Sequence, residues 1–331
     1  MKDKNVVGRC PVCDDPKFKT LYSAQTLISD FGLIQCKRCY LTRTHPLPTN
    51  EMLQLYDIDF YYGKNKNKFS YFLQYVRNNI IKLRARRLMA LFPDSTAFPN
   101  VLDIGCAEGR LLEKLRDYGC RCWGVEHAAY PSQRFLKRDK IKYQQGDLQI
   151  LDLKEGSFDL VVLWHVLEHM DDPRAVMKRI YRLLSPEGIL ILAVPNFSSL
   201  EANRFKDSWF HLDIPWHKYH FSITAMEYLI KKSDFRVINL STFCFEQGPY
   251  GLFQSILNKT GWPINEFYEA LKGNKNNRRG LHLAAQLFMA ITLSIPCLIA
   301  GYLEALAGKG AILKYALRKV SFGDSKIHQT K

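Results

Sequence analysis

The chain has 331 residues, 47% of them hydrophobic, which is enough to bury one large domain and a small module. Its 47 basic and 32 acidic residues give a net charge of +15, which favours contact with an anionic surface such as phospholipid headgroups or nucleic acid. No apolar run follows Met1-Lys-Asp-Lys-Asn5, and five of the nine cysteines are scattered. We therefore expect a cytoplasmic protein with no signal peptide and no disulfide framework.

Two C-x-x-C pairs, Cys10 with Cys13 and Cys36 with Cys39, are separated by 22 residues. Four thiolates at this spacing are typical of a closed, tetrahedral zinc site. A segment of about 40 residues cannot bury enough apolar surface to fold unaided, so the metal would supply folding energy. The pattern predicts a structural zinc ribbon over residues 1–48. A catalytic metal would need an open coordination position, and a redox pair would need a βαβ context.

Residues 49–95 are expected to form a linker and a helix. Glu51–Tyr62 predicts a short helical turn ending in aromatic residues. Between Lys68 and Phe92, apolar residues recur at helical spacing, which predicts a helix packed on the sheet that follows. Its basic run from Lys82 to Arg87 fits a solvated helix face as well as an anionic contact.

A strand, a glycine turn and a helix are predicted around Val101-Leu-Asp-Ile-Gly-Cys-Ala-Glu-Gly109. A second apolar run, beginning at Cys120, ends in Glu126. This arrangement is typical of a nucleotide-cofactor site at the edge of a parallel sheet. Glu108 would repel a pyrophosphate, so the loop favours a cofactor that contains adenosine but no phosphate.

Further strands are predicted at Ile141–Asp147, Phe158–Trp164 and Ile189–Val194, with a helix from Pro173 to Leu184 and a turn at Ser185–Gly188. Two more strands are expected at 236–245 and 311–320. Strands that alternate with helices predict an α/β fold with a doubly wound, mostly parallel, seven-stranded sheet whose core spans 96–245.

These motifs, in this order, resemble the class I S-adenosylmethionine-dependent methyltransferases. The resemblance implies that the cofactor loop is formed by Asp103, Gly105, Cys106 and Gly109. It also implies that Glu126 holds the ribose, that Asp147 and Leu148 meet the adenine, and that Trp164 and His165 lie beside the methionine moiety. With its zinc ribbon, the chain resembles a bacterial subgroup associated with glycan and lipid modification.

The run His165-Val-Leu-Glu-His169 also matches the H-x-x-E-H signature of a zinc-protease family. That function would require both histidines on a helix and a further ligand downstream. The segment instead follows a buried strand within a parallel-sheet pattern, and methyltransferases have a similar sequence here without metal.

Three histidines and two tryptophans lie between Trp209 and Ser222, after the fifth strand. Methyl transfer depends mainly on orientation, and a hydroxyl acceptor also benefits from a base whose pKa lies near the working pH. We expect His217 or His220, and then His169, to be the base. Each of them could instead simply pack or cap.

Residues 246–310 look like an insertion between the last two strands, followed by the tail 321–331. Leu281–Leu303 has 23 residues without a formal charge, enough to span a bilayer. A single crossing would separate the final strand from its sheet, so we expect one helix, or two broken at Pro296, in contact with one leaflet. A cap over the active site and a dimer interface remain alternatives.

These features together predict a methyltransferase peripheral to the inner face of the cytoplasmic membrane. Its expected acceptor is an oxygen of a lipid-linked glycan or another amphipathic molecule, such as a quinone-like phenol. No nucleic-acid partner is expected, and the sequence leaves the oligomeric state open. The alternatives are an RNA methyltransferase that binds RNA through its ribbon and a cofactor-binding scaffold without catalysis.

Overall fold

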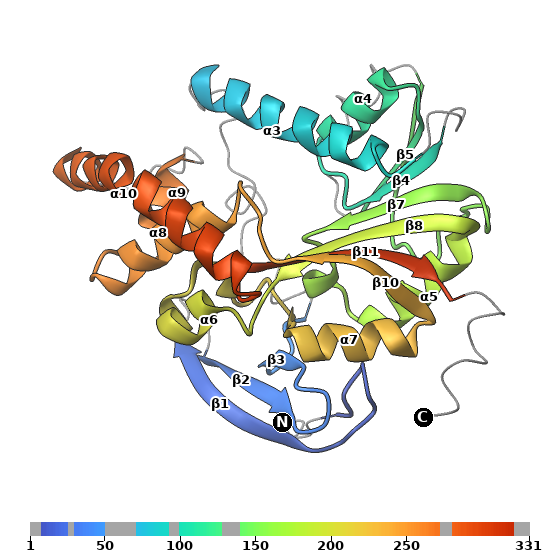
Figure 1. Cartoon of the computed structure of the whole chain (residues 1–331). Helices are drawn as coiled ribbons and strands as arrows, with labels where there is room; N and C mark the ends of the chain where they lie inside the picture. The colour runs from blue at the N-terminus through green and yellow to red at the C-terminus, as the bar shows by residue number, and fades with distance from the viewer. Residues whose placement is uncertain are drawn as a thin grey trace. The chain divides into compact units, whose positions relative to one another are not determined.

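The structure is a computed structural model that describes residues 8–25, 30–49, 71–92, 99–127, 140–271 and 280–320 (Figure 1). The helix expected over Glu51–Tyr62 and the tail 321–331 lie outside these residues. The chain divides into two compact units. The ribbon unit comprises Met1–Gln74, Pro195–Met226 and Ser241–Leu313, and the sheet unit comprises Tyr75–Val194, Glu227–Leu240 and Lys314–Lys331.

The sheet unit is built on a seven-stranded sheet of order β10-β11-β8-β7-β4-β5-β6. Its strands are β4 (Asn100–Ile104), β5 (Arg121–Glu126), β6 (Ile141–Gln145), β7 (Phe158–Trp164), β8 (Leu184–Pro195), β10 (Phe235–Ser241) and β11 (Ile312–Lys319). The pairs β4–β5, β4–β7, β5–β6 and β7–β8 are parallel. The last strand of the chain, β11, lies between β8 and β10, so the predicted fold class is confirmed.

Helices cover both faces of this sheet, which is why its central strands are continuous apolar runs. In β7, Leu160 and Val162 belong to the core cluster beneath the helices α3 (Tyr71–Met89) and α4 (Arg110–Asp117). Val161 and Leu163 alternate with them and are equally buried. The helix α5 (Pro173–Leu183) lies on the opposite side of the sheet from α3 and α4 in Figure 1.

The strand β8 is longer than its apolar run, and the turn predicted at Ser185–Gly188 is wrong. Phe158 pairs with Leu184 and Leu160 pairs with Ile189, so the four residues between form a bulge within the strand. A Cβ at Gly188 would lie 2.8 Å from the carbonyl oxygen of Phe158. Glycine is therefore required by a close backbone approach in the bulge, not by a turn.

The ribbon unit contains a four-stranded sheet of order β1-β2-β3-β9. Its strands are β1 (Phe18–Gln25), β2 (Asp30–Cys36), β3 (Thr42–His45) and β9 (Tyr219–His220), and all pairs are antiparallel. The short β9 pairs Thr42 with His220 and Arg43 with Tyr219. The histidine segment therefore completes the sheet of the N-terminal ribbon.

The remaining helices are α6 (Leu200–Phe205), α7 (Ile223–Lys232), α8 (Gly248–Lys259), α9 (Glu266–Leu271) and α10 (Gly280–Leu306). The last three lie together in Figure 1 and share a core formed by Leu252, Phe253, Leu257, Phe267 and Cys297. The predicted apolar helix is a single continuous helix that passes through Pro296.

Candidate functional site

The glycine loop after β4 is shaped by left-handed backbone and by a close neighbour. Gly105 and Gly109 have φ angles of 73° and 66°, values that side chains with a Cβ rarely adopt. A Cβ on Gly105 would lie 2.3 Å from Cγ2 of Val166. The loop is therefore in direct contact with the segment that follows β7, within the sheet unit.

Glu126 at the end of β5 is tied to this loop by backbone hydrogen bonds. Its Oε2 accepts the N–H of Ala107 at 2.9 Å, and its Oε1 accepts the N–H of His127 at 3.0 Å. A carboxylate has about four lone-pair sites, so two remain after these bonds. An oriented carboxylate with two remaining acceptor sites can bind the two hydroxyls of a ribose.

Asp103 lies at the end of β4, next to the loop. It is buried, and burial raises the pKa of its carboxyl to about 7, with Glu126 adding to the rise and Arg84 opposing it. Cys106 is also buried, and its Sγ would lie 2.8 Å from a Cβ on Gly124. The thiol fills the space that this glycine leaves, and burial raises its pKa, so it is not a nucleophile at neutral pH.

Asp147 and Leu148 follow β6, the strand next to β5. Oδ1 of Asp147 accepts the N–H of Gln149 at 2.9 Å, which forms a local turn, and Leu148 is buried. The N–H of Gly146 donates to the carbonyl of Glu126 at 3.0 Å. The residues predicted to meet ribose and adenine are thus on neighbouring strand ends.

The helix α3 contributes residues that the sequence analysis did not assign to a site. The guanidinium of Arg84 lies over the ring of Trp164, 3.8 Å from its centroid. Asn78 accepts a hydrogen bond from Arg110, which pairs with Glu108 of the loop. In the sequence, Arg84 stands out only as part of the basic run from Lys82 to Arg87, which does not indicate a contact with Trp164.

Trp164 ends β7 and His165 follows it, on the side of the glycine loop. The indole Nε1 of Trp164 is buried and has no hydrogen-bond partner in the part of the chain that the structure describes. A buried N–H without a partner costs free energy, and a hydrogen bond to an acceptor atom of a bound ligand would remove that cost.

His165 has a φ of 56°, and its Nδ1 lies 3.2 Å from Oε1 of Glu168, whose side chain is 1% exposed. A short 3₁₀ turn, Leu167–His169, brings the two together. The zinc-protease signature needs both histidines on one α-helix, and this turn does not provide it. Glu168 is a site residue that we identified only as part of that signature.

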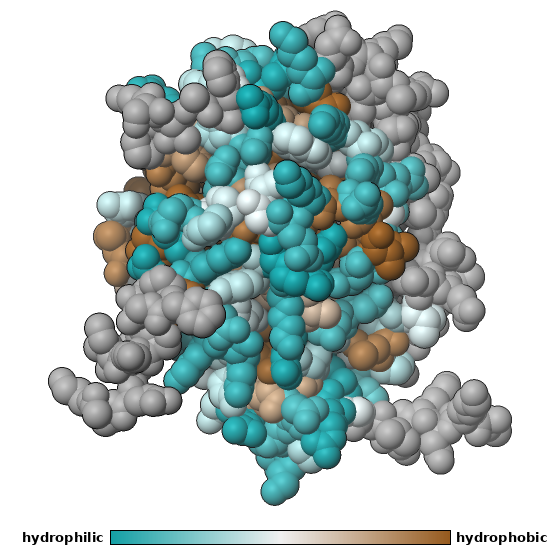
Figure 2. Space-filling model, turned by 90° about the vertical axis from the view of Figure 1, so that its right-hand side faces the viewer, coloured by the Kyte–Doolittle hydropathy of each residue, from teal (hydrophilic) through white to brown (hydrophobic). Residues whose placement is uncertain are grey.

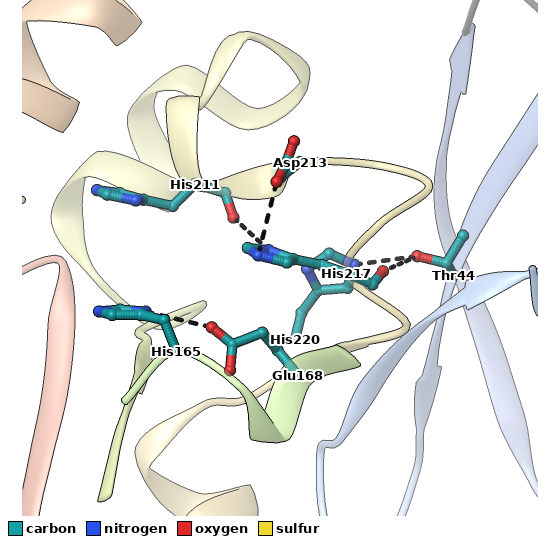
Figure 3. Close-up of polar contacts among 7 residues, drawn as sticks. All are labelled: Thr44, His165, Glu168, His211, Asp213, His217 and His220. Atoms are coloured by element: carbon teal, nitrogen blue, oxygen red, sulfur yellow. Dashed lines mark hydrogen bonds and ion pairs between the residues drawn. The ribbon is translucent and has the colours of Figure 1, made fainter. Parts of the chain in front are cut away.

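The ribbon unit holds a second cluster of histidines (Figure 3). Nδ1 of His217 lies 3.0 Å from the carbonyl of His211 and donates to it. Nε2 of His217 is 3.9 Å from Oδ2 of Asp213. All three imidazoles of this segment are buried.

His220 is connected to the ribbon through Thr44 of β3. The hydroxyl of Thr44 donates to the carbonyl of His217 at 2.7 Å and lies 3.2 Å from Nε2 of His220. Because the single hydroxyl proton is used, Nε2 of His220 donates and Nδ1 is the acceptor, a tautomer assigned from the network. Burial, with His217 nearby, holds the pKa of His220 well below its usual value, so the ring is neutral.

The four ribbon cysteines converge on one point. The Sγ atoms of Cys10 and Cys39 are 3.5 Å apart, those of Cys13 and Cys36 are 3.4 Å apart, and all four lie within 4.8 Å of one another. Zn–S bonds of about 2.3 Å in a tetrahedron place sulfurs about 3.8 Å apart. The buried thiols therefore fit a four-sulfur zinc site.

Comparisons with known proteins agree with the geometry of the sheet unit. A family model described as a methyltransferase domain matches residues 73–240, just over half of the chain. The chain belongs to this methyltransferase family. Its domain is of the class I type that uses S-adenosylmethionine, which confirms the predicted cofactor.

Curated relatives of the methyltransferase domain match over part of their length. A ubiquinone biosynthesis O-methyltransferase from Psychrobacter cryohalolentis is 30% identical over 105 residues, 29% of this chain and 41% of that protein. One of the same name from Coxiella burnetii is 31% identical over 105 residues, 29% of this chain and 44% of that protein. The chain thus spans less than half the length of these relatives.

Solved structures similar to this chain include an S-adenosylmethionine-dependent methyltransferase from Mesorhizobium loti. It has 16% identity and a TM-score of 0.44, and the match covers 71% of this chain and 96% of that chain. A methyltransferase from Archaeoglobus fulgidus has 18% identity and a TM-score of 0.45, and covers 76% and 100% respectively.

Proposed function

We propose that this methyltransferase transfers a methyl group from S-adenosylmethionine to a hydroxyl oxygen of an amphipathic acceptor, either a lipid-linked glycan or a quinone-like phenol. The main support for the proposal is the carboxylate of Glu126, which a hydrogen bond from the glycine loop orients. Gly105 of this loop lies directly against Val166, which follows β7. The names of the relatives, O-methyltransferases of ubiquinone biosynthesis, support oxygen as the acceptor atom and an amphipathic substrate.

Different residues of the sheet unit would bind different parts of the cofactor. Glu126 would bind the ribose hydroxyls, Asp147 and Leu148 the adenine, and Trp164 with His165 the methionine part. Asp103, Gly105, Cys106 and Gly109 would shape the loop around it. When bound, the cofactor supplies an electrophilic methyl group on a sulfonium, and the remaining catalysis is orientation of the acceptor oxygen in line with it.

A hydroxyl acceptor must also lose its proton to a base. Within the sheet unit, His165 is a candidate, because Oε1 of Glu168 lies 3.2 Å from its Nδ1 and can orient the ring. In the ribbon unit, His220 is neutral with Nδ1 as acceptor, and His217, held through its Nδ1 at the carbonyl of His211, is the next candidate. His169, in the 3₁₀ turn, is the fourth candidate.

Four single glutamine substitutions separate these candidates. The base variant should lower kcat about 10²–10⁴-fold with little change in cofactor affinity, and the acidic limb of its pH–rate profile should disappear. A structural histidine would instead change stability, and a residue that only packs beside the methionine part would change cofactor affinity.

We further propose that the ribbon binds one structural zinc ion through Cys10, Cys13, Cys36 and Cys39. A closed four-sulfur site offers no open position for chemistry, so its role is to fold the sheet that β9 completes. The metal would then support the position of His220 through β3 and Thr44.

The acceptor can be found by incubating the purified chain with methyl-deuterated cofactor and a bacterial extract separated into lipid, glycan and RNA fractions. The proposal predicts the labelled methyl in a lipid or glycolipid species, on an ether oxygen. Label in RNA would favour an RNA methyltransferase, and cofactor binding without label in any fraction would favour a scaffold.

A further inference from the structure

The helix α10 has two faces of opposite character. One face packs within the ribbon unit, where Gln286 and Cys297 are buried and Leu293 joins the core shared with α8 and α9. The other face is exposed and apolar, and we call it the α10 stripe. It consists of Leu287, Phe288, Ile291, Ile295, Ile299, Tyr302, Leu303 and Leu306.

The α10 stripe is long and almost free of polar groups. Phe288, Ile291 and Ile295 are 68%, 69% and 67% exposed. At about 1.5 Å per residue, the stripe extends over roughly 29 Å. Three residues with hydroxyls lie on exposed positions of α10. Two of them bond back to the helix, Thr292 to the carbonyl of Phe288 and Ser294 to that of Ile291, and the third is the phenol of Tyr302 within the stripe. The exposed surface therefore offers little for water to bind.

Charge is placed at the ends of the helix and not along it. No residue from 281 to 303 carries a formal charge, whereas the eight residues before the helix, 272–279, include four basic and no acidic ones. At the other end, the partly buried Glu304 lies in the last turn and the exposed Lys309 follows the helix. By contrast, the face shown in Figure 2 is mostly hydrophilic, and its apolar residues are scattered.

We propose that the α10 stripe lies in the interface of an anionic phospholipid bilayer, with the helix parallel to the membrane plane. Amphipathic helices bind in this way when an apolar face enters the boundary between headgroups and acyl chains and basic residues meet the headgroups. A protein partner would be expected to make about ten hydrogen bonds, for which the stripe has few groups.

Contacts along the other face explain why the helix does not cross the membrane. They begin near its start, where His282 packs on Trp262, and continue to Gly301, whose added Cβ would lie 3.7 Å from Pro249. The neighbouring helices carry Lys259 at the end of α8 and Glu266 in α9, which bonds to Gln286 at 2.6 Å. A crossing would place these polar groups in hydrocarbon, where charged and unpaired polar groups are strongly disfavoured.

The test uses the full chain and preformed vesicles of phosphatidylcholine, with and without phosphatidylglycerol, in a flotation assay. The unaltered protein should float with the anionic vesicles. The double variant Ile291→Glu with Ile295→Glu should bind at least about tenfold more weakly, because it places two charges at the apolar boundary. The double variant Ile150→Glu with Ile238→Glu is the matched control, since it adds the same two charges at residues that are 82% and 46% exposed in the sheet unit, and its binding should be unchanged.

Circular dichroism and urea denaturation of each variant show whether the ribbon unit is still folded, because α10 belongs to that unit and binding of S-adenosylmethionine would report only on the sheet unit. The proposal is overturned if the unaltered chain stays off anionic vesicles, or if the double variant floats equally well. If the unaltered chain is a dimer that does not bind vesicles, and the double variant is a monomer, the stripe is a contact between two copies of the chain. No acceptor is present, so this result is independent of the proposed methylation.

Discussion

Replacement of Gly105 by alanine should be much more damaging than replacement of another glycine with the same backbone. The left-handed φ of 73° costs an alanine about 1–2 kcal/mol in general. The clash of the new Cβ with Val166 Cγ2, at 2.3 Å, adds about 1–3 kcal/mol, the usual cost of overpacking. The expected loss of unfolding free energy is therefore about 2–5 kcal/mol, together with weaker cofactor binding.

Two further variants separate the terms. Gly156→Ala has a φ of 66° but nothing within 4 Å of its added Cβ, so it should lose only the backbone term. Val166→Ala in the Gly105→Ala background should recover most of the clash term. Urea denaturation followed by tryptophan fluorescence measures all four proteins. Equal losses for the two glycine variants, with no rescue by Val166→Ala, would refute the contact between the loop and the segment after β7.

Three other changes test separate parts of the structure. Burial raises the pKa of Asp103 to about 7 in the fold, so the contribution of its carboxyl to stability is present at low pH and is lost as pH rises through 7. In denaturation curves, Asp103→Asn should therefore gain stability relative to the unaltered cofactor-free protein between pH 5 and pH 8. The opposite slope would mean that pairing with Arg84 outweighs burial. Elemental analysis should find about one zinc per chain, and the Cys36→Ser variant should lose both the metal and the ribbon fold. Purified protein that is folded but contains no metal would contradict the zinc site. If His220 is the base, Thr44→Val should lower kcat about tenfold at unchanged KM, because the hydroxyl of Thr44 fixes the tautomer of His220. Thr44→Ser keeps the hydroxyl and should retain the original kcat. An unchanged kcat in Thr44→Val would argue against His220 as the base.

The strands of the sheet unit could be predicted because their signal is local. A strand buried on both faces is a continuous apolar run, and β7 begins and ends at the predicted residues, Phe158 and Trp164. The bulge in β8 could not be predicted in the same way. Ser185–Gly188 has turn composition, and only the pairing of Phe158 with Leu184 extends the strand through it.

The cysteine spacing predicted that four thiols would meet, and the structure brings them together. It did not indicate that the ribbon sheet would take a fourth strand from Tyr219–His220. A two-residue strand has no periodicity to detect, and its partner is about 175 residues away in the sequence. The link from Thr44 to His220 depends on that pairing.

Long-range packing also explains the rest of what the sequence did not reveal. The uncharged run predicted an apolar helix, but the sequence alone did not separate the face that packs on α8 and α9 from the α10 stripe. In the same way, nothing local indicates that Arg84 stacks on Trp164. Each is a contact between segments that are distant in the sequence.

Titration calorimetry with S-adenosylmethionine tests the central claim most directly. The purified chain should bind the cofactor at one site, and Glu126→Ala should bind it at least about tenfold more weakly, because a hydrogen bond to a charged group contributes about 1.5–3 kcal/mol. A folded chain that does not bind the cofactor, or a Glu126→Ala variant with unchanged affinity, would contradict the assignment of this site.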